Sequence, residues 1–354
     1  MRMCQPHESS TPGVVLADIG GTHARFALLG RGPRDLRHLR VYRCSEFGTL
    51  EEVLDRYLAS LGAFSIQGAC LAVPGPIDQD PLILPNNPWQ VSRERLEGAL
   101  RAPVTLMNDF MAQGFATEAL LPHEVRFSQA VIPDRSGVRL VLGPGTGLGM
   151  AIRPSPGRVM PSEGGHSGFS PSTMHELEVM QVLLRRFRRV SVERVLSGPG
   201  LVNLYLANRE LLGGPPAFLD ASEPRDAARG EEPDGVPDPG IVPEKVSEAA
   251  ARGEPLAVRA VQDFFDILAS FAGDMALTVW AAGGVYITGD LVQKLSPFLD
   301  EERFRARFAA KGRLGDFCTS VAIGWVDAPE PGLLGCAVRM WDGVSEGISS
   351  PGPT

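Results

Sequence analysis

The sequence lacks several features that would assign it to a common class of protein. It contains no Gly-Lys-Ser/Thr phosphate loop, which excludes a Walker-type nucleotide site. Its five cysteines are widely scattered, form no Cys-x-x-Cys pair and show no zinc-ligand spacing. Scattered cysteines of odd number are typical of reduced thiols, so we expect a cytoplasmic protein without a disulfide framework.

Signals for membranes and nucleic acids are missing as well. Residues 1–12 are polar and contain no apolar segment of a signal peptide. The longest apolar helical pattern, residues 258–279, includes Arg259, Asp263, Asp266 and Asp274, which excludes a membrane span. Lys and Arg total 34 against 42 Asp and Glu, and no basic run resembles a nucleic-acid footprint. We therefore expect neither a membrane nor a nucleic acid as partner.

The chain does contain enough residues, 354, for two lobes with cores of their own. Strand-like runs alternate with helical patterns, which is typical of α/β proteins. The strand-like runs are residues 14–17, 26–29, 68–73, 103–107 and 285–288, and the helical patterns are 50–61, 93–101, 174–188 and 258–279. Residues 213–243 are rich in proline and acids, which predicts an insertion rather than a domain.

The helical pattern at 174–188 allows two finer predictions. Leu177, Met180, Leu184 and Phe187 recur at helical spacing, so we expect them to form its buried face. The arginines at positions 185, 186, 188 and 189 are interpreted as structural cations at the carboxyl end of that helix.

Two glycine-rich turns carry the strongest functional signal. The first is Asp18-Ile-Gly-Gly-Thr22, and the second is Gly143-Pro-Gly-Thr-Gly-Leu-Gly149; each lies between two apolar runs. We expect glycine to supply a positive φ in both turns and to let main-chain N–H groups converge on an anion. Two such turns predict a polyphosphate held from both sides, by related halves that face each other across a cleft.

Polar side chains that suit a sugar occur in three further segments. Asn108-Asp109 follows a strand, and by itself is also explained as a helix cap. Glu163 and His166 flank two glycines, a spacing that also suits a cap or a metal pair, and Glu193 also suits a surface acid. Together, these groups match the hydroxyls of a neutral polyol. Phosphate turns combined with polyol ligands predict phosphoryl transfer to a sugar.

These motifs, in this order, resemble the bacterial glucokinase family. The resemblance also includes Glu193-Arg-Val-Leu-Ser-Gly-Pro-Gly-Leu-Val-Asn-Leu-Tyr205 and Pro331-Gly-Leu-Leu-Gly335, and spans about residues 13–342. It implies a two-lobed α/β fold of the hexokinase and actin-like ATPase type, with a duplicated mixed-sheet core and a cleft between the lobes. The implied small lobe is residues 1–115 with a C-terminal helix at about 332–345, and the large lobe is residues 116–331 with the insertion at 213–243.

The resemblance also implies roles for individual residues in ATP- and Mg²⁺-dependent phosphorylation of the glucose 6-hydroxyl. Asp109 matches the catalytic base. The residues that match glucose ligands are Asn108, Glu163, His166, Glu193 and, in a sugar-side loop with Trp89, Asn86. The residues that match nucleotide-binding turns are Asp18, Gly20, Gly21, Thr22, Gly145, Thr146, Gly147 and Gly289, with Asp18 holding Mg²⁺ through water. Homodimers are common in this family.

Several positions depart from the family pattern. His23 replaces an asparagine after the first turn, Asp290 replaces a glycine in the nucleotide-side turn, and Ser167-Gly168-Phe169 lacks an acid. Asp290 could weaken ATP binding or change the phosphoryl donor. These departures leave two alternatives: a sugar-binding regulator without catalytic activity on the same fold, or a kinase for another hexose such as mannose or glucosamine. A DNA-binding regulator would need an N-terminal helix-turn-helix, for which too few residues precede the first strand.

Overall fold

The computed structural model describes residues 12–62, 64–75, 77–84, 87–128, 131–213 and 241–348. The chain divides into two compact units. Unit 1 consists of Met1–Leu121, Pro156–Pro161 and Ala328–Thr354, and unit 2 of Pro122–Ser155 and Ser162–Asp327. Among the described helices, none is both long and apolar enough to cross a bilayer.

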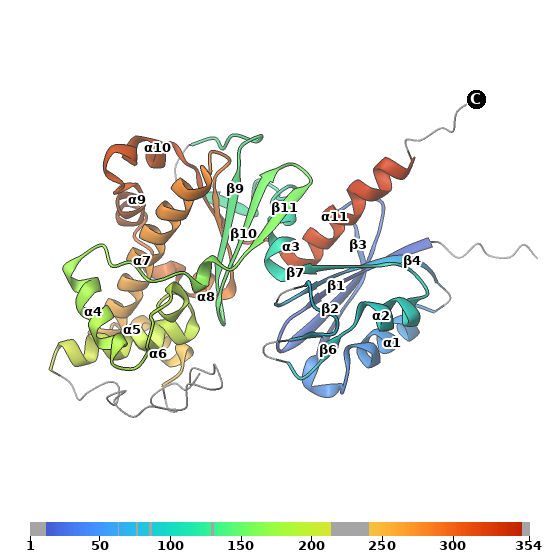
Figure 1. The fold of residues 1–354 in the computed structure, drawn as a ribbon, viewed down its shortest axis with the longest axis horizontal. Helices are drawn as coiled ribbons and strands as arrows, with labels where there is room; N and C mark the ends of the chain where they lie inside the picture. The colour runs from blue at the N-terminus through green and yellow to red at the C-terminus, as the bar shows by residue number, and fades with distance from the viewer. Residues whose placement is uncertain are drawn as a thin grey trace, which may run out of the picture. The chain divides into compact units, whose positions relative to one another are not determined.

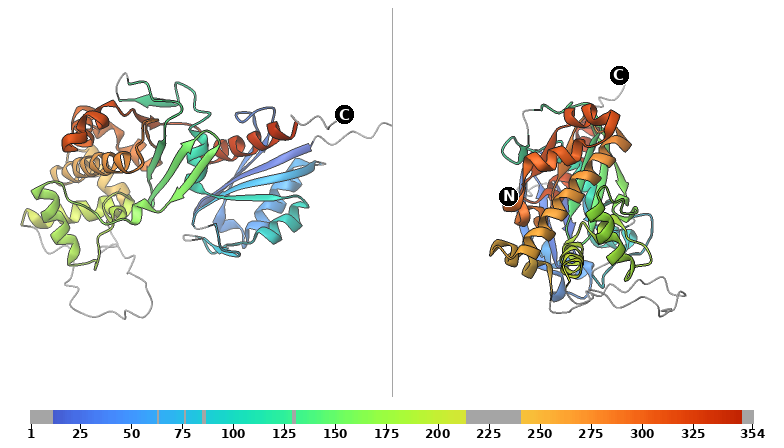
Figure 2. Two further views of the ribbon diagram at one scale, coloured as in Figure 1. Left: turned by 45° about the horizontal axis from the view of Figure 1, so that its top comes forward. Right: turned by 90° about the vertical axis from the view of Figure 1, so that its left-hand side faces the viewer.

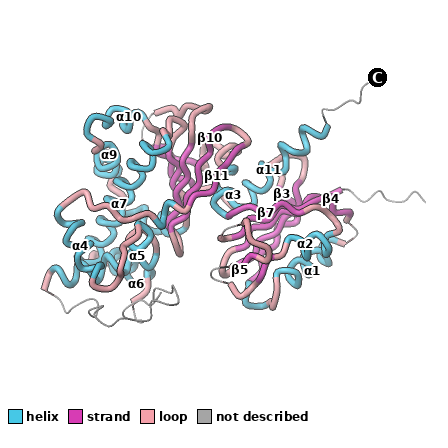
Figure 3. The backbone as a smooth tube through the Cα atoms, in the orientation of Figure 1, coloured by secondary structure: helices cyan, strands magenta, loops and turns pink. Residues whose placement is uncertain are grey.

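The sheet of unit 1 has five strands in the order β3-β2-β1-β4-β7 (Figure 3). The strands are β1 (Pro12–Ile19), β2 (His23–Leu29), β3 (Leu36–Arg43), β4 (Ser65–Val73) and β7 (Val104–Asn108). Strands β1 and β2 form an antiparallel hairpin, and β1, β4 and β7 run parallel. Two short strands, β5 (Leu82–Ile83) and β6 (Gln90–Val91), pair separately.

Helices cover both faces of this sheet (Figure 1). Along β1, Val15 and Ala17 belong to a core shared with α1 (Leu50–Leu61) and α2 (Arg93–Leu100). Leu16 instead contributes to a core with α3 (Asp109–Ala116) and α11 (Pro331–Ile348). This alternation is the two-residue period of a strand that is buried on both faces.

The sheet of unit 2 repeats this topology. Its six strands follow the order β11-β10-β9-β12-β13-β8, so an antiparallel hairpin again precedes two parallel strands. The strands are β8 (Val125–Phe127), β9 (Arg139–Pro144), β10 (Leu148–Ser155), β11 (Arg158–Ser162), β12 (Val285–Ile287) and β13 (Ile323–Val326). Strand β11 pairs in this sheet although residues 158–161 are grouped with unit 1. The duplicated mixed-sheet core that the family resemblance implies is thus confirmed.

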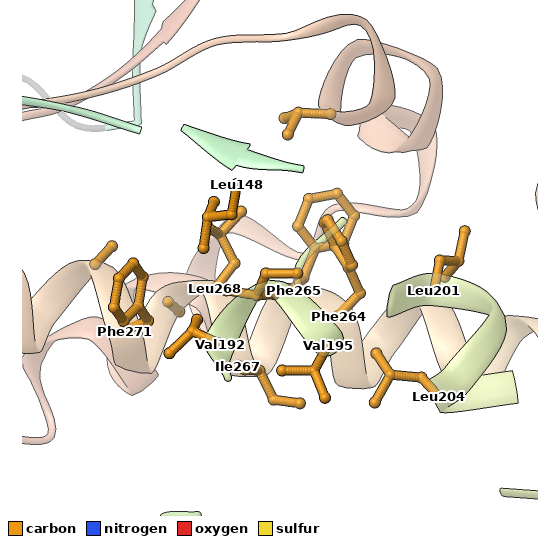
Figure 4. Packing of buried hydrophobic residues seen from close by; sticks show 14 of the residues in the cluster. Leu148, Val192, Val195, Leu201, Leu204, Phe264, Phe265, Ile267, Leu268 and Phe271 are labelled. Atoms are coloured by element: carbon orange, nitrogen blue, oxygen red, sulfur yellow. The ribbon is translucent and has the colours of Figure 1, made fainter. Parts of the chain in front are cut away.

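Helices gather on one face of this second sheet (Figure 2). They are α4 (Met174–Leu184), α5 (Gly198–Leu211), α6 (Pro243–Ala251), α7 (Pro255–Val279), α8 (Asp290–Leu295), α9 (Glu301–Ala309) and α10 (Gly315–Ser320). The described part of unit 2 also contains the 3-10 turns η2 (Gly164–His166), η3 (Val192–Arg194), η4 (Ser296–Phe298) and η5 (Gly312–Leu314), while η1 (Cys44–Glu46) belongs to unit 1. The helix predicted at 258–279 lies within α7, which supplies a stripe of core residues that includes Phe264, Phe265 and Leu268 (Figure 4).

The predicted buried face of α4 is wrong in part. Phe187 is buried and Met180 packs against the core, but Leu177 and Leu184 are exposed. The buried residues of the helix include Val179, Val182 and Leu183 instead. The physical reason is Glu176, a buried carboxylate that pairs with Arg307 of α9 and accepts a hydrogen bond from Ser172 N at 2.6 Å. That ion pair turns the polar side of α4 inward, which hydrophobic spacing cannot reveal.

Some predictions fall partly outside the described residues. Residues 214–240 of the predicted insertion are not described, and Pro243 already begins α6. Asn86 is not described either, whereas the neighbouring Trp89 is buried and donates from Nε1 to Phe47 O at 3.1 Å. The four cysteines in the described part of the chain, at positions 44, 70, 318 and 336, are buried free thiols.

Candidate active site

The first glycine turn closes the hairpin of β1 and β2. Ile19 pairs with Ala24, and Gly20 N donates to His23 O at 2.9 Å. Because this bond uses the carbonyl of His23, the turn closes in the same way whichever side chain occupies that position. Cys44 supports the turn from beneath, since its N–H donates to Thr22 O at 2.9 Å. Thr22 itself is exposed, as a ligand-binding hydroxyl requires.

The second glycine turn closes the hairpin of β9 and β10 and is shorter. Pro144 pairs with Leu148, and Gly145 N donates to Gly147 O at 2.8 Å. The start of α5 is tied to this turn, because Gly198 N donates to Gly145 O at 2.8 Å. Thr146 is exposed at the tip of the turn.

The predicted reason for glycine in these turns is wrong. Among the described residues, the glycines with a positive φ lie elsewhere, for example Gly75 and Gly289. At Gly147 the requirement is instead for space, since an ideal Cβ would lie 2.5 Å from Glu193 Oε2. Glycine thus serves close approach here rather than an unusual backbone conformation.

Asp18 is the second-last residue of β1, beside the first turn, and faces the amino-terminal turn of α11. An ideal Cβ on Gly332 would lie 2.5 Å from Asp18 Cγ, so this glycine makes room for the carboxylate. Arg25 Nη1 lies 3.9 Å from Asp18 Oδ2, while Arg25 Nε pairs with Glu330 Oε2 at 2.9 Å. Burial raises the pKa of Asp18 to about 6; Arg25 opposes this shift and the negative charge of Glu330 adds to it.

Asn108 and Asp109 lie where β7 passes into α3. Asn108 caps the helix, because its Oδ1 accepts from Phe110 N at 2.9 Å and from Met111 N at 3.3 Å. Asp109 is the first helical residue, and its Oδ1 accepts from Phe110 N at 2.8 Å. The amino-terminal end of a helix stabilises the ionised form of such a carboxylate.

Strand register places Asp109 and the first turn at one edge of the unit 1 sheet. Asp18 pairs with Ala72 of β4, and Ala72 pairs with Met107 of β7. Two strand spacings therefore separate Asp18 from Met107, about 10 Å. The predicted base and the predicted phosphate turn thus belong to the same edge.

The sugar-side residues of unit 2 also lie close together. Glu193 Oε1 is 3.9 Å from His166 Nδ1, and His166 Nε2 is 3.9 Å from Glu163 Oε2. Glu163 and His166 are exposed, with side-chain exposures of 70% and 62%, while that of Glu193 is 28%. The structure thus brings two carboxylates and an imidazole together, and their role as sugar ligands stays a prediction.

Several residues that the sequence analysis did not select hold this set in place. Arg189 Nη2 donates to His166 O at 2.6 Å, and Val192 N donates to Ser167 O at 2.9 Å. The interpretation of Arg189 as a helix-terminal cation is wrong, since α4 already ends at Leu184. An ideal Cβ on Gly165 would lie 2.2 Å from Leu148 O, so the loop also packs on β10.

Gly289 follows β12 and lies against the second turn. Its φ is 112°, and an ideal Cβ would lie 2.8 Å from Pro144 O, so both backbone conformation and space require glycine. Asp290 is the first residue of α8 and is exposed. Its carboxylate therefore adds a negative charge to the same edge of the sheet as the second turn.

The residues at the first turn fit a magnesium ion that arrives with a nucleotide. Mg²⁺ is usually held by one or two carboxylates, several waters and substrate phosphates. Asp18 supplies one such carboxylate, and within the described ranges no cluster of three His, Cys, Asp or Glu forms a metal site of its own. A cation beside Asp18 would also offset the cost of ionising this buried group.

Two sheets that share a strand order, each with a glycine turn in its antiparallel hairpin, place the protein in the hexokinase and actin-like ATPase fold class. The crystal structure of a glucokinase from an Antarctic psychrotroph has this fold: its TM-score is 0.79 at 28% identity, covering 94% of this chain and 99% of that chain. The glucokinase of Caulobacter sp. (strain K31) is 35% identical over 92% of this chain and 94% of its own length.

A further relative, the glucokinase of Xanthomonas campestris pv. campestris (strain 8004), is 37% identical over 93% of this chain and 95% of its own length. The family model for glucokinase matches residues 15–342. The chain belongs to the glucokinase family, and it is therefore an ATP-dependent hexose kinase, a transferase.

Proposed function

We propose that this chain transfers the γ-phosphoryl group of ATP to the 6-hydroxyl of glucose. One observation carries the residue assignment: β1 and β7 bring the phosphate turn and Asp109 to the same edge of one sheet, with a single strand between them. A turn that binds phosphate and a carboxylate that accepts a proton, at that separation, suit a hydroxyl that attacks a terminal phosphate.

Asp109 acts as the catalytic base. Phosphoryl transfer passes through a loose transition state, so positioning and charge stabilisation matter more than the strength of the base. Hydrogen bonding to Phe110 N fixes the carboxylate at the start of α3, where it can orient the 6-hydroxyl. It takes the proton late, as the forming oxygen–phosphorus bond acidifies the hydroxyl.

The other polar groups bind the sugar. Glu163, His166 and Glu193 hydrogen-bond hydroxyls of glucose, and Asn108 adds an amide beside Asp109. Asn86 is assigned to the same role from the sequence resemblance alone. A set that pairs each hydroxyl discriminates against sugars that lack one, since its polar groups would then stay unpaired.

The two glycine turns bind the nucleotide. Gly21 and Thr22 contribute main-chain N–H groups and a hydroxyl in the first turn, and Thr146 and Gly147 do so in the second, while Gly20 and Gly145 use their own N–H groups to close the two turns. Gly289 allows its own backbone to lie close to the second turn, on the side that is assigned to the adenosine. When bound, Mg²⁺ neutralises developing charge on the phosphates, and Asp18 orients its water ligands.

The proposal extends to where the enzyme works. Buried free thiols at all four described cysteine positions support a reducing compartment, and we assign the protein to the cytoplasm.

A coupled assay with purified protein, glucose, ATP and Mg²⁺ tests this function, with mannose and glucosamine as alternative acceptors and polyphosphate and ADP as alternative donors. We expect glucose and ATP to give the highest kcat/KM. Sugar binding without ADP formation under any of these conditions would instead support a regulator on the same fold.

A further inference from the structure

Leu148 joins the second glycine turn to the sugar-side residues. Its N–H donates to Glu193 Oε2 at 2.7 Å. On its other side, Gly165 packs so closely on Leu148 O that no Cβ would fit between them. The side chain of Leu148 is buried in the core of unit 2, where Figure 4 shows it in the same cluster as Val192. The peptide of Leu148 is therefore held between the core and two sugar-side segments.

Hydrogen bonds extend this link into a closed ring. Gly145 N donates to Gly147 O within the turn, and Gly198 N donates to Gly145 O, each at 2.8 Å. Ser197, the cap of α5, donates from Oγ to Glu193 O at 2.8 Å. From Glu193 the ring returns to the turn through Leu148 N. The turn assigned to phosphate and the carboxylate assigned to sugar thus form one bonded unit.

The carboxylate of Glu193 also occupies the space where a side chain at position 147 would lie. An ideal Cβ on Gly147 would lie 2.5 Å from Glu193 Oε2, the oxygen that accepts from Leu148. The backbone of Gly147 does not have a positive φ, so a larger residue is excluded by Glu193 and not by conformation. Since the contact is with the end of a flexible side chain, alanine at this position would displace Glu193 and leave the fold intact.

We propose that Glu193 couples nucleotide binding to sugar binding through Leu148 N–H and Gly147. This inference rests on the proposed function of the two residue sets. A carboxylate held in one orientation loses less conformational freedom when the sugar binds. When the phosphates of a nucleotide order the turn, the affinity for the sugar therefore rises. By linkage, bound sugar raises the affinity for the nucleotide by the same factor. Gly147 and Leu148 are positioning residues for sugar binding, although they lie in the nucleotide-side turn.

Two matched variants test the proposal. Gly147→Ala places a methyl group against Glu193, whereas Gly145→Ala, two residues away, meets nothing within 4 Å. The readout is the glucose Kd from calorimetry, measured without nucleotide and then with Mg²⁺ and a non-hydrolysable ATP analogue.

For the wild type we expect the analogue to lower the glucose Kd at least about fivefold, a typical coupling between two sites. For Gly147→Ala we expect a nucleotide-free Kd raised about tenfold or more, the scale of losing one charge-assisted hydrogen bond, and no further effect of the analogue. Gly145→Ala keeps the wild-type value within about twofold in the nucleotide-free measurement, because its methyl group meets no neighbouring atom.

Steady-state kinetics and thermal unfolding separate this role from a merely structural one. Gly147→Ala raises KM for glucose more than KM for ATP, while both variants unfold within a few degrees of the wild type. A Gly147→Ala protein that binds glucose as the wild type does, or a Gly145→Ala protein that loses as much affinity, would overturn the coupling. Absence of glucose-dependent ADP formation in the wild type would contradict only the proposed function, since the binding comparison would still decide the coupling.

Discussion

The two sheets share one strand order but place different chemistry at their edges. In unit 1, acids lie at the ends of strands: Asp18 is the second-last residue of β1, and Asp109 directly follows β7. In unit 2, glycines follow two of the strands, Gly145 after β9 and Gly289 shortly after β12, whereas β13, the counterpart of β7 in the strand order, is followed by Asp327. The acids of unit 2 that are assigned to the sugar, Glu163 and Glu193, come instead from segments packed onto the turn.

This difference shows how one topology supports two tasks. An acid fixed at a strand end has little freedom, which suits a group that must meet a reacting atom. Acids on short 3-10 turns, held by bonds such as that of Glu193 to Leu148, can adjust to a sugar and to the neighbouring turn. We therefore expect substitutions in unit 1 to change mainly the rate and those in unit 2 mainly the affinity.

The largest effect expected is on the rate, at Asp109. Removing a general base lowers rates by about 10² to 10⁴-fold, and loss of hydroxyl positioning adds to this. For Asp109→Ala we expect kcat to fall about 10³-fold or more, as measured by the coupled assay. A variant with near-normal kcat would remove Asp109 from the reaction and break the division between the units.

Next in size is a stability effect at Gly335 of α11. An ideal Cβ there would lie 1.8 Å from Ala112 O of α3, so the two helices meet at their backbones. We expect Gly335→Ala to lower the free energy of unfolding by about 3 kcal/mol, measured by urea titration. Gly98→Ala in α2 is the matched control, because nothing lies within 4 Å of that position. There we expect stabilisation by about 0.5 to 1 kcal/mol.

A pH-dependent effect of intermediate size is expected at Asp18. Its folded-state pKa is raised from 3.8 to about 6, so ionisation is disfavoured in the folded state and stability is lost as the pH rises through 6. Asp18→Asn removes this loss. Without nucleotide or divalent ion, we expect it to stabilise the protein at pH 8 by about 1 to 3 kcal/mol.

The gain at Asp18 should shrink as the pH falls from 6 toward 3.8 and vanish below 3.8, where the wild-type carboxyl is protonated in both states. Thermal unfolding of the variant and the wild type across this range provides the measurement. A difference that is constant with pH would show that burial does not suppress ionisation of Asp18.

The smallest effect is expected at Asp290, the exposed first residue of α8. Removing its charge with Asp290→Asn should lower KM for ATP about twofold at low ionic strength, since exposed charges interact weakly. Salt should erase the difference, because its screening length is about 3 Å at 1 M. A KM that rises instead would mean that Asp290 assists the nucleotide, contrary to its interpretation as a departure from the family pattern.

The sequence predicted most elements of the fold because their signals are local. The helix predicted at 50–61 matches α1, whose start is fixed by Thr49 accepting from Glu52 N at 3.2 Å. The face of α4 could not be predicted, because Glu176 is buried by a partner, Arg307, that lies 131 residues away in the sequence. The spacing of residues along a helix predicts which of them share a face. It does not predict which polar residue is buried because it pairs with a residue far away in the sequence.

The site shows the same limit. Glu193, His166 and Glu163 could be selected by motif, and the structure brings them together. The residues that position these three side chains could not be predicted from the sequence. Leu148 donates its main-chain N–H to Glu193, and Arg189 donates to the main-chain carbonyl of His166. Main-chain contacts leave no signal in the side-chain pattern, although Gly147 and Gly165 marked places where segments approach closely.

Glucose affinity without nucleotide tests the division between the two units most directly. Calorimetry on Asp109→Ala and Glu193→Ala, side by side with the wild type, supplies the comparison. The account predicts that Asp109→Ala keeps its glucose Kd within about threefold, whereas Glu193→Ala weakens binding at least about tenfold through loss of a charged ligand. Equal losses in both variants, or a larger loss for Asp109→Ala, would contradict it.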